Sequence, residues 1–357
     1  MNKIKNKINN RLQEYKNKSS LEKRTVWVDF LTRNALYIVI AILVIYVTIL
    51  FPDFLSATSL IDILRKAAAK LPLALGVGGI IILTGTDLSV GRTVGLTACV
   101  AASLLQRTDY PSKMFPGSEP LPIFVVLLIC IAIGAIVGVL NGFFVAEFKL
   151  HPFVVTLATQ MMLYGAVLIY VELGTNAGKP ISGLTDSYTE VIKGSVLNIG
   201  GTAIPNYVWY AIALTVIVWL VWNKTTLGKN MYAVGSNPEA ATVSGVSVKK
   251  TTILVFLIAG ILYGFSGFIE AARIGSNNAS TGTGYETDAI AAVVIGGVSF
   301  SGGIGKISGV ITGVILLQLV TVALQWLSVS VNLTYIIKGA IILFACAIDM
   351  RKYLQKK

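Results

Sequence analysis

The sequence predicts an all-α, polytopic membrane protein with about ten transmembrane helices. Of its 357 residues, 55% are hydrophobic and 13% are charged, whereas a soluble chain carries about a quarter charged residues. The apolar residues gather in runs of about 17–25, the length that a helix needs to cross the hydrocarbon core of a bilayer. Basic residues gather at both ends of the chain, outside these runs.

The apolar runs number about ten, although eight or nine spans also fit, because two of the runs are weak. The second run contains Arg65, Lys66 and Lys70, and the eighth is short and rich in glycine. We expect the boundaries to shift by several residues. The runs lie near 34–51, 60–84, 90–106, 121–142, 153–172, 206–222, 251–271, 286–300, 305–328 and 333–349.

The charge distribution predicts that both termini are cytoplasmic. Residues 1–33 carry nine Lys or Arg against three acidic residues, and such excess marks the cytoplasmic side. A basic arm can also bind nucleic acid, but beside membrane spans we expect no nucleic-acid partner. The predicted organisation is a basic leader, 1–33, a transmembrane domain, 34–349, with a cytoplasmic loop, 223–250, and a basic tail, 350–357.

Glycines recur at a spacing of four residues on two predicted spans. In lipid, small residues let helix backbones approach closely, and this packing replaces the hydrophobic drive that water supplies. Packing within the chain and a seam between two copies both remain open. The glycines are Gly134, Gly138 and Gly142 on one span and Gly305, Gly309 and Gly313 on the other, with a shorter case at Gly260 and Gly264.

Residues for catalysis or for a metal site are scarce. His151 is the only histidine, and Cys99, Cys130 and Cys346 lie inside apolar runs without metal-ligand spacing. No glycine-rich phosphate loop of the Walker type occurs. The sequence therefore predicts a non-catalytic membrane protein with no metal and no cofactor.

The positions of the charged residues bear on what drives transport. Ionisable groups deep in a membrane are costly and mark ion-coupled carriers, but here they concentrate at the ends of the predicted spans. Lys338 is the deepest, and it can reach an interface by snorkelling. This distribution weakens, without excluding, an ion-gradient-driven secondary transporter of a small neutral solute. An intramembrane enzyme is disfavoured, because no nucleophile and base pair can be assembled.

Two interruptions between apolar runs carry hydroxyl, amide and backbone groups. Irregular backbone at membrane depth is tolerated where it lines a cavity or lies buried in protein. Such groups could exchange hydrogen bonds with a neutral solute, although each residue alone also fits a turn or helix cap. The candidate pathway or gate residues are Thr84, Gly85, Thr86, Asp87 and Ser89, then Asn277 and Asn278, followed by the acidic Glu286 and Asp288.

The cytoplasmic loop contains a short, well-capped helix. The side chain of Asn237 can accept hydrogen bonds from free backbone N–H groups, and Pro238 suits the first helical position. Glu239 places negative charge at the positive end of the helix dipole. Gly245 can end the helix in the left-handed region. A helix this short is marginal alone, so it needs contacts, either with a cytoplasmic partner or with the membrane surface.

Three segments resemble, in the same order, those of ABC sugar-importer permeases of the ribose and galactose class. NKTTLGKNMYAVGSNPEAATVSGV resembles the loop by which that family engages its separate ATPase subunit. TGTDLSVGR resembles the family signature at the end of the second span, and GYETDAIAAVVIGGVSFSGGIGK resembles a late membrane segment. Thr86, PISG and YIIKGAIILFACAID resemble most the galactose/methyl-galactoside branch.

The resemblance implies the permease subunit of an ATP-driven monosaccharide importer in a bacterial inner or plasma membrane. Its expected partners are ABC ATPase subunits inside, a periplasmic or lipid-tethered sugar-binding protein outside and a second permease copy. Galactose or methyl-galactoside is the expected sugar, with glucose and ribose left open. By the same resemblance Asp87, Ser89, Gly91 and Arg92 match the signature, in a structural or gating role. The implied coupling residues are Asn237, Pro238, Glu239, Ala240, Ala241 and Gly245.

Overall fold

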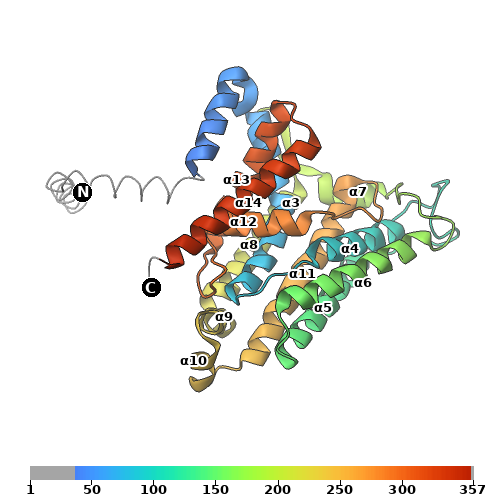
Figure 1. Ribbon diagram of the computed structural model, residues 1–357. Coiled ribbons are helices and arrows are strands. Elements are labelled where there is room, and N and C mark those ends of the chain that lie inside the picture. The colour runs from blue at the N-terminus through green and yellow to red at the C-terminus, as the bar shows by residue number, and fades with distance from the viewer. Residues whose placement is uncertain (1–36, 355–357) are drawn as a thin grey trace.

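The computed structural model describes residues 37–354, and Figure 1 shows their helices packed side by side. The predicted leader, 1–33, lies outside the described residues, as does the end of the predicted tail. The first described helix is Tyr37–Leu50, followed by the single turn η1 (Pro52–Leu55). The other helices are α3 (Ala57–Ile82), α4 (Val90–Leu104), α5 (Ile123–Glu147), α6 (Pro152–Glu172), α7 (Asp186–Lys193), α8 (Asn206–Lys224), α9 (Thr226–Ser236), α10 (Pro238–Val243), α11 (Val248–Ile274), α12 (Tyr285–Ile295), α13 (Ile307–Trp326) and α14 (Val331–Leu354).

A hairpin interrupts the helical fold between α7 and α8. Strand β1 (Ser195–Ile199) pairs antiparallel with β2 (Thr202–Pro205). Gly200 and Gly201 form the turn, with φ of +57° and +78°, and two residues with positive φ match the twist of a hairpin. The described fold is otherwise helical, as predicted, but the sequence did not predict these two strands in the loop between the fifth and sixth spans.

Five helices are long and apolar enough to cross a membrane: α5, α6, α8, α11 and α13. Tyr37–Leu50, α4 and the first part of α14 are shorter apolar helices. Helix α3 has 26 residues, but its charges, Arg65 and Lys66 among them, set it apart from these five. The described residues therefore form a polytopic membrane protein. Helix α14 continues to Leu354, past the predicted start of the tail at residue 350.

The eighth predicted span, 286–300, is not a complete membrane helix. Helix α12 ends at Ile295 after 11 residues, and at 1.5 Å per residue it is about 16 Å long. That is about half the thickness of a hydrocarbon core. Gly297, Gly302 and Gly303 follow with positive φ, so the glycines that weakened the prediction form a loop instead of a helix.

The long helices run between two opposite sides of the molecule. The α7 side carries α7 and the hairpin, and the α10 side carries α9 and α10. Helix α3 begins on the α7 side, where Arg65 donates a hydrogen bond to the carbonyl of Ala203. It ends on the α10 side, where the carbonyl of Ile82 accepts a hydrogen bond of 2.9 Å from the N–H of Gly303. The predicted coupling residues lie on the α10 side, and most of the predicted pathway residues lie elsewhere in the molecule.

The spaced glycines pack helices of the same chain together. A Cβ on Gly134 of α5 would lie 2.1 Å from the carbonyl oxygen of Gly260 on α11, and one on Gly264 would lie 2.2 Å from that of Cys130. A Cβ on Gly313 of α13 would lie 1.9 Å from the carbonyl oxygen of Ala292 on α12. Of the two interpretations left open, these contacts support packing within the chain.

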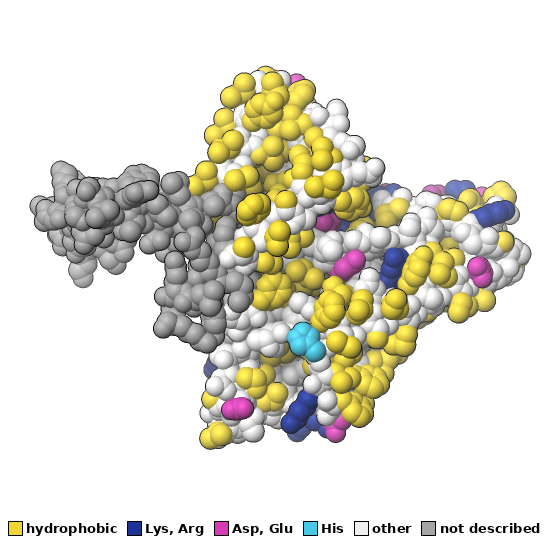
Figure 2. All heavy atoms as spheres, viewed as in Figure 1, with side chains coloured by type: hydrophobic (Ala, Val, Ile, Leu, Met, Phe, Trp, Pro, Cys, Tyr) yellow, Lys and Arg dark blue, Asp and Glu magenta, His cyan; other side chains and the backbone are white. Residues whose placement is uncertain are grey.

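Apolar side chains cover large parts of the surface, as Figure 2 shows over α5 and α6. On α6, Met161, Met162 and Ile169 are 72%, 66% and 66% exposed. Contiguous exposed apolar surface of this kind marks contact with a membrane or with another protein. In a polytopic protein, this apolar surface is expected to face the lipid bilayer.

Candidate coupling surface and membrane pathway

The short helix α10 begins with the cap that the sequence predicts. The side chain of Asn237 accepts a hydrogen bond of 2.9 Å from the backbone N–H of Ala240. Pro238 is the first helical residue, and Glu239 lies in the first turn. This arrangement satisfies a free N–H at the helix start, so a helix of six residues is held without a long hydrogen-bond ladder.

The end of α10 turns the chain toward α11. Gly245 has φ +82°, a conformation that glycine adopts without strain. The N–H of Val246 then donates a 2.9 Å hydrogen bond to the carbonyl of Ala241. Ala241 is only 4% exposed, whereas Val243 is 89% exposed. One face of α10 thus packs on its own chain, and the other faces outward and is free to meet a partner.

Helix α9 connects α10 to the membrane-spanning helices. Gly235, near its end, lies so close to α3 that a Cβ would be 1.8 Å from the carbonyl oxygen of Ile82. That carbonyl also accepts the hydrogen bond of Gly303, in the loop before α13. The hydroxyl of Tyr232 donates a 3.0 Å hydrogen bond to the carbonyl of Gly305 in the same loop. The end of α9 is therefore in direct contact with the end of α3 and with the loop before α13.

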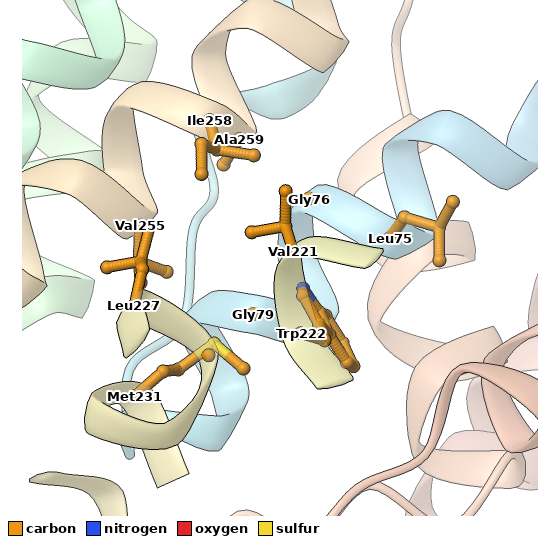
Figure 3. Close-up of a pocket in the computed structure, with 11 residues that line it drawn as sticks. Leu75, Gly76, Gly79, Val221, Trp222, Leu227, Met231, Val255, Ile258 and Ala259 are labelled. Carbon is orange, nitrogen blue, oxygen red and sulfur yellow. The ribbon is translucent and has the colours of Figure 1, made fainter. Parts of the chain in front are cut away.

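Figure 3 shows the residues against which the other face of α9 packs. Met231 of α9 and Trp222 of α8 lie beside Gly76 and Gly79 of α3, with Val255 of α11 completing a tight apolar pocket. Gly79 leaves room for these larger side chains next to the α3 backbone, and Gly76 does the same for Tyr263 of α11. Close-packed contacts transmit displacement, because they leave little space to absorb it.

We expect Gly235→Ala to weaken transport several-fold while the chain still inserts. The added methyl group would overlap the carbonyl of Ile82, so α9 must move away from α3, and such overpacking costs typically 1–3 kcal/mol. The measurement is solute uptake at matched membrane levels of the chain. Gly165→Ala is the control, because a Cβ there meets nothing within 4 Å. Equal uptake by the two variants would contradict the role given to α9.

The signature TGTDLSVGR forms a buried polar network at the start of α4. The Oδ1 of Asp87 accepts hydrogen bonds from the N–H of Ser89 at 2.8 Å and from its hydroxyl at 2.6 Å. Asn141 of α5 donates to the Ser89 hydroxyl at 3.0 Å, and Thr159 of α6 donates to Asn141 at 2.6 Å. Asp87 and Ser89 are 1% and 0% exposed. This geometry fixes α4 against α5 and α6.

The residues before this network lie nearer the α10 side. Thr84 has φ +64° and is exposed. Gly85 is buried, and a Cβ there would lie 3.2 Å from Pro152 at the start of α6. The carbonyl of Thr86 accepts a 3.3 Å hydrogen bond from Thr156. Gly85 and Thr86 therefore connect the end of α3 to the start of α6, at the beginning of the interruption.

The structure brings the second interruption beside the first. A Cβ on Gly91 would lie 2.3 Å from both the carbonyl oxygen of Gly282 and the carboxylate of Glu286. Arg92 donates a 2.9 Å hydrogen bond to the carbonyl of Ala279, and its guanidinium lies 4.2 Å from the centre of the Tyr164 ring. The start of α4 thus contacts the segment before α12, although the two lie about 190 positions apart in the sequence. Arg92 is half-buried between α4 and α6.

Asn277 and Asn278 stabilise the turn after α11. The backbone of Asn277 pairs with Ile181, through hydrogen bonds of 2.7 and 2.9 Å, and its amide donates to the carbonyl of Ala271 at 3.0 Å. The side chain of Asn278 accepts hydrogen bonds from the N–H and hydroxyl of Ser280. Both side chains therefore bond within the turn, although the buried Oδ1 of Asn277 has no hydrogen-bond partner among the described residues.

A cluster of charged residues holds the start of α12. Arg273 donates two hydrogen bonds of 2.6 Å to the carboxylate of Glu270, which is 3% exposed. The hydroxyl of Tyr285, the first residue of α12, donates to the same carboxylate. The ammonium of Lys70 lies 2.7 Å from the centre of the Tyr285 ring. We call these four residues the Glu270 cluster.

An ion pair joins α12 to α14. The ammonium of Lys338 lies 2.9 Å from Oδ1 of Asp288, and both side chains are mostly buried. Lys338 therefore pairs with Asp288 and does not snorkel to an interface. Glu286, two residues earlier on α12, lies beside Gly91 instead. The two acidic candidates thus face different neighbours, α14 and α4.

Sequence reasoning missed the Glu270 cluster as a unit. Lys70 appears in the sequence only as a charge that weakens a predicted span, and Glu270 and Arg273 appear as charges at a span end. A carboxylate and an arginine three residues apart on a helix lie on one face, and that signal could have paired them. No pattern in the sequence joins Lys70 to Tyr285. Among the described residues, no group of His, Cys, Asp or Glu could hold a metal ion.

Comparison with known proteins agrees with this arrangement. Residues 59–346 match the family described as the branched-chain amino acid transport system / permease component. The galactose/methyl galactoside import permease protein MglC of Escherichia coli K12 is 42% identical over 339 residues, 95% of this chain and 100% of that protein. The MglC protein of Haemophilus influenzae gives the same values. The ribose import permease protein RbsC of E. coli K12 is 33% identical over 316 residues, 88% of this chain and 92% of that protein. No solved structure matches the chain.

These matches confirm the resemblance that the three sequence segments carry. They extend over the interruption at 84–92, the helices α9 and α10, and the loop before α13. A permease component is the membrane-embedded, non-catalytic subunit of an ABC transporter, as the sequence predicts. The chain is thus a multi-pass inner-membrane permease, and it belongs to the branched-chain amino acid transport system / permease component family.

Proposed function

We propose that this chain is the permease subunit of an ATP-driven importer of galactose and methyl-galactoside. The support for the sugar is the identity of 42% with MglC over the full length of that relative, against 33% with the ribose permease RbsC. The observation that carries the mechanism is α10, a capped helix with an outward face, joined to α3 and α13 through Gly235.

In this proposal the chain crosses the membrane ten times, with both termini in the cytoplasm. The turns of residues 275–284 and the half-helix α12 together make the eighth crossing, because the loop after α12 contacts α9 on the α10 side. The α10 side is then cytoplasmic, and it carries Lys224, Lys229 and Lys250, as the positive-inside rule requires. The α7 side faces the sugar-binding protein.

The proposed complex contains two permease copies, ATPase subunits on the cytoplasmic side and a sugar-binding protein outside. ATP binding closes the ATPase pair and moves the two α10 helices. The motion passes through α9 to α3 and to the loop before α13, and the pathway between the permeases changes the side to which it opens. The two interruptions at 84–92 and 277–288 lie beside these moving parts and are the proposed gate.

Reconstitution in liposomes tests this function. We expect uptake of radiolabelled galactose only when the ATPase, the binding protein and ATP are all present. Methyl-galactoside should compete with galactose at lower concentration than ribose does. A pH or sodium gradient without the ATPase is the second arm of the experiment. Uphill uptake in that arm would refute the ATP-driven importer and favour the ion-gradient-driven secondary transporter.

A further inference from the structure

A groove lies between α8, α13 and α3, and its lining includes no residue of α10 or of the proposed gate. It consists of two cavities of about 440 and 320 Å³. Thr215, Val216 and Ile311 line both cavities, so the two cavities lie next to each other. Along α8 the lining runs from Val208 to Asn223, which at 1.5 Å per residue is about 22 Å.

The lining of the groove changes from apolar to basic along its length. The half nearer the α7 side is lined by aliphatic residues such as Leu64, Ala211 and Ile315. The half nearer the α10 side adds Trp219, Asn223 and Lys306. An amphipathic ring next to a lysine is typical of the level at which lipid headgroups lie.

The charges at the α10 end of the groove are all positive. Lys306 is exposed and lines the cavity. The ammonium of Lys224 lies 5.6 Å from the centre of the Trp219 ring. Neither α8 nor α13 contains an acidic residue, and no carboxylate in the described residues pairs with Lys224 or Lys306. The end of the groove therefore fits an anionic group.

We propose that this groove binds one anionic phospholipid of the cytoplasmic leaflet. The acyl chain lies in the aliphatic half, and the headgroup phosphate accepts hydrogen bonds from Lys306 and Lys224. The length of about 22 Å exceeds half of a hydrocarbon core of about 30 Å, which is the depth that one leaflet occupies. The basic end of the groove lies on the same side of the molecule as α9. Its assignment to the cytoplasmic leaflet therefore rests on the proposed membrane topology.

The bound phospholipid would connect the two helices that flank the coupling path. Helix α8 leads into α9, and Lys306 precedes α13 directly after the loop that α9 contacts. A headgroup held by both lysines spans the gap between these helices. Its loss should therefore lower transport without separating the chain from its ATPase.

Lipid retention by the full chain tests the proposal. The chain is reconstituted with equal amounts of phosphatidylglycerol and phosphatidylcholine, extracted in mild detergent and analysed for bound lipid by native mass spectrometry. We expect the ratio of phosphatidylglycerol to phosphatidylcholine to fall about fivefold for each lysine lost in Lys306→Gln and Lys224→Gln, as expected for basic residues beside an anionic headgroup. Lys250→Gln removes the same charge from the same side outside the groove, and it should leave the ratio unchanged.

A second variant separates a lipid from a protein occupant. Ile311→Trp fills the junction of the two cavities, so bound lipid of both kinds should fall while the oligomeric state stays the same. Dissociation of a dimer by Ile311→Trp, with lipid retention intact, would overturn the proposal in favour of a second copy in the groove. An equal fall in the ratio for Lys250→Gln and Lys306→Gln would also overturn it, because it would show only general attraction to a basic surface.

Discussion

Replacing Glu239 with lysine is expected to abolish sugar uptake while leaving the chain folded and inserted. Glu239 lies in the first turn of α10 and is exposed. No described residue forms an ion pair with it. Its contribution within the chain is the interaction of one carboxylate with the helix dipole, which is worth about 0.3–1 kcal/mol. A loss of transport far larger than this cost must come from outside the chain.

The expected cause is contact with the ATPase. The outward face of α10 carries Glu239 and Val243, and Ala241 holds the opposite face on the chain. A lysine at position 239 reverses the charge at the centre of this small surface, and a like charge brought against a partner costs several kcal/mol. The two measurements are ATP-dependent uptake in liposomes and co-purification of the ATPase with the permease.

Glu119→Lys is the matched control for Glu239→Lys. It makes the same charge change at an exposed residue in the loop between α4 and α5, on the opposite side of the molecule. Co-purification of the ATPase should be lost for Glu239→Lys and kept for Glu119→Lys. Normal uptake and normal co-purification by Glu239→Lys would remove α10 from the coupling contact.

The helix α10 could be predicted from sequence because its determinants are local. Asn237, Pro238 and Gly245 each act on backbone groups within a few residues of their own position. The path from α10 into the membrane could not be predicted. It depends on Gly235 meeting Ile82 and Gly303, which are far apart in the sequence. The sequence around Gly235 does not indicate which distant backbone this glycine approaches.

The membrane spans, too, could be predicted where local sequence determines the structure and not where it depends on distant residues. Hydrophobic length located most of the helices to within a few residues, because insertion into lipid depends on the segment itself. It failed at α12, where the segment 286–300 is apolar enough but its glycines end the helix at Ile295. It also missed β1 and β2, because SVLNI and TAIP do not alternate between apolar and polar residues as a typical strand does.

Glu270→Gln is expected to cost about 3–5 kcal/mol of folding free energy, because it removes one partner from a buried charge cluster. The carboxylate of Glu270 accepts two hydrogen bonds from Arg273 and one from Tyr285. With a neutral amide in its place, Arg273 and Lys70 remain without the negative charge that offsets them. Unfolding temperature in detergent and the yield of folded chain measure this loss.

Glu172→Gln provides the comparison for this substitution. Glu172 is an exposed carboxylate at the end of α6, and surface substitutions of this kind change stability by about 0.5 kcal/mol or less. The double variant Glu270→Gln with Arg273→Gln removes both charges of the pair. It should be more stable than Glu270→Gln alone, since the uncompensated guanidinium is gone. Equal stability of Glu270→Gln and Glu172→Gln would show that the cluster does not hold the fold.

The same substitution should also impair transport in the molecules that do fold. Tyr285 begins α12, and its hydroxyl bonds to Glu270 and so fixes the half-helix against α11. Gly282 and Glu286, on either side of Tyr285, contact Gly91 at the other interruption. Releasing Tyr285 therefore loosens both segments of the proposed gate at once. We expect Glu270→Gln to uncouple ATP hydrolysis from uptake, with hydrolysis retained because α10 is unchanged. Retained coupling in the folded fraction would limit the cluster to stability.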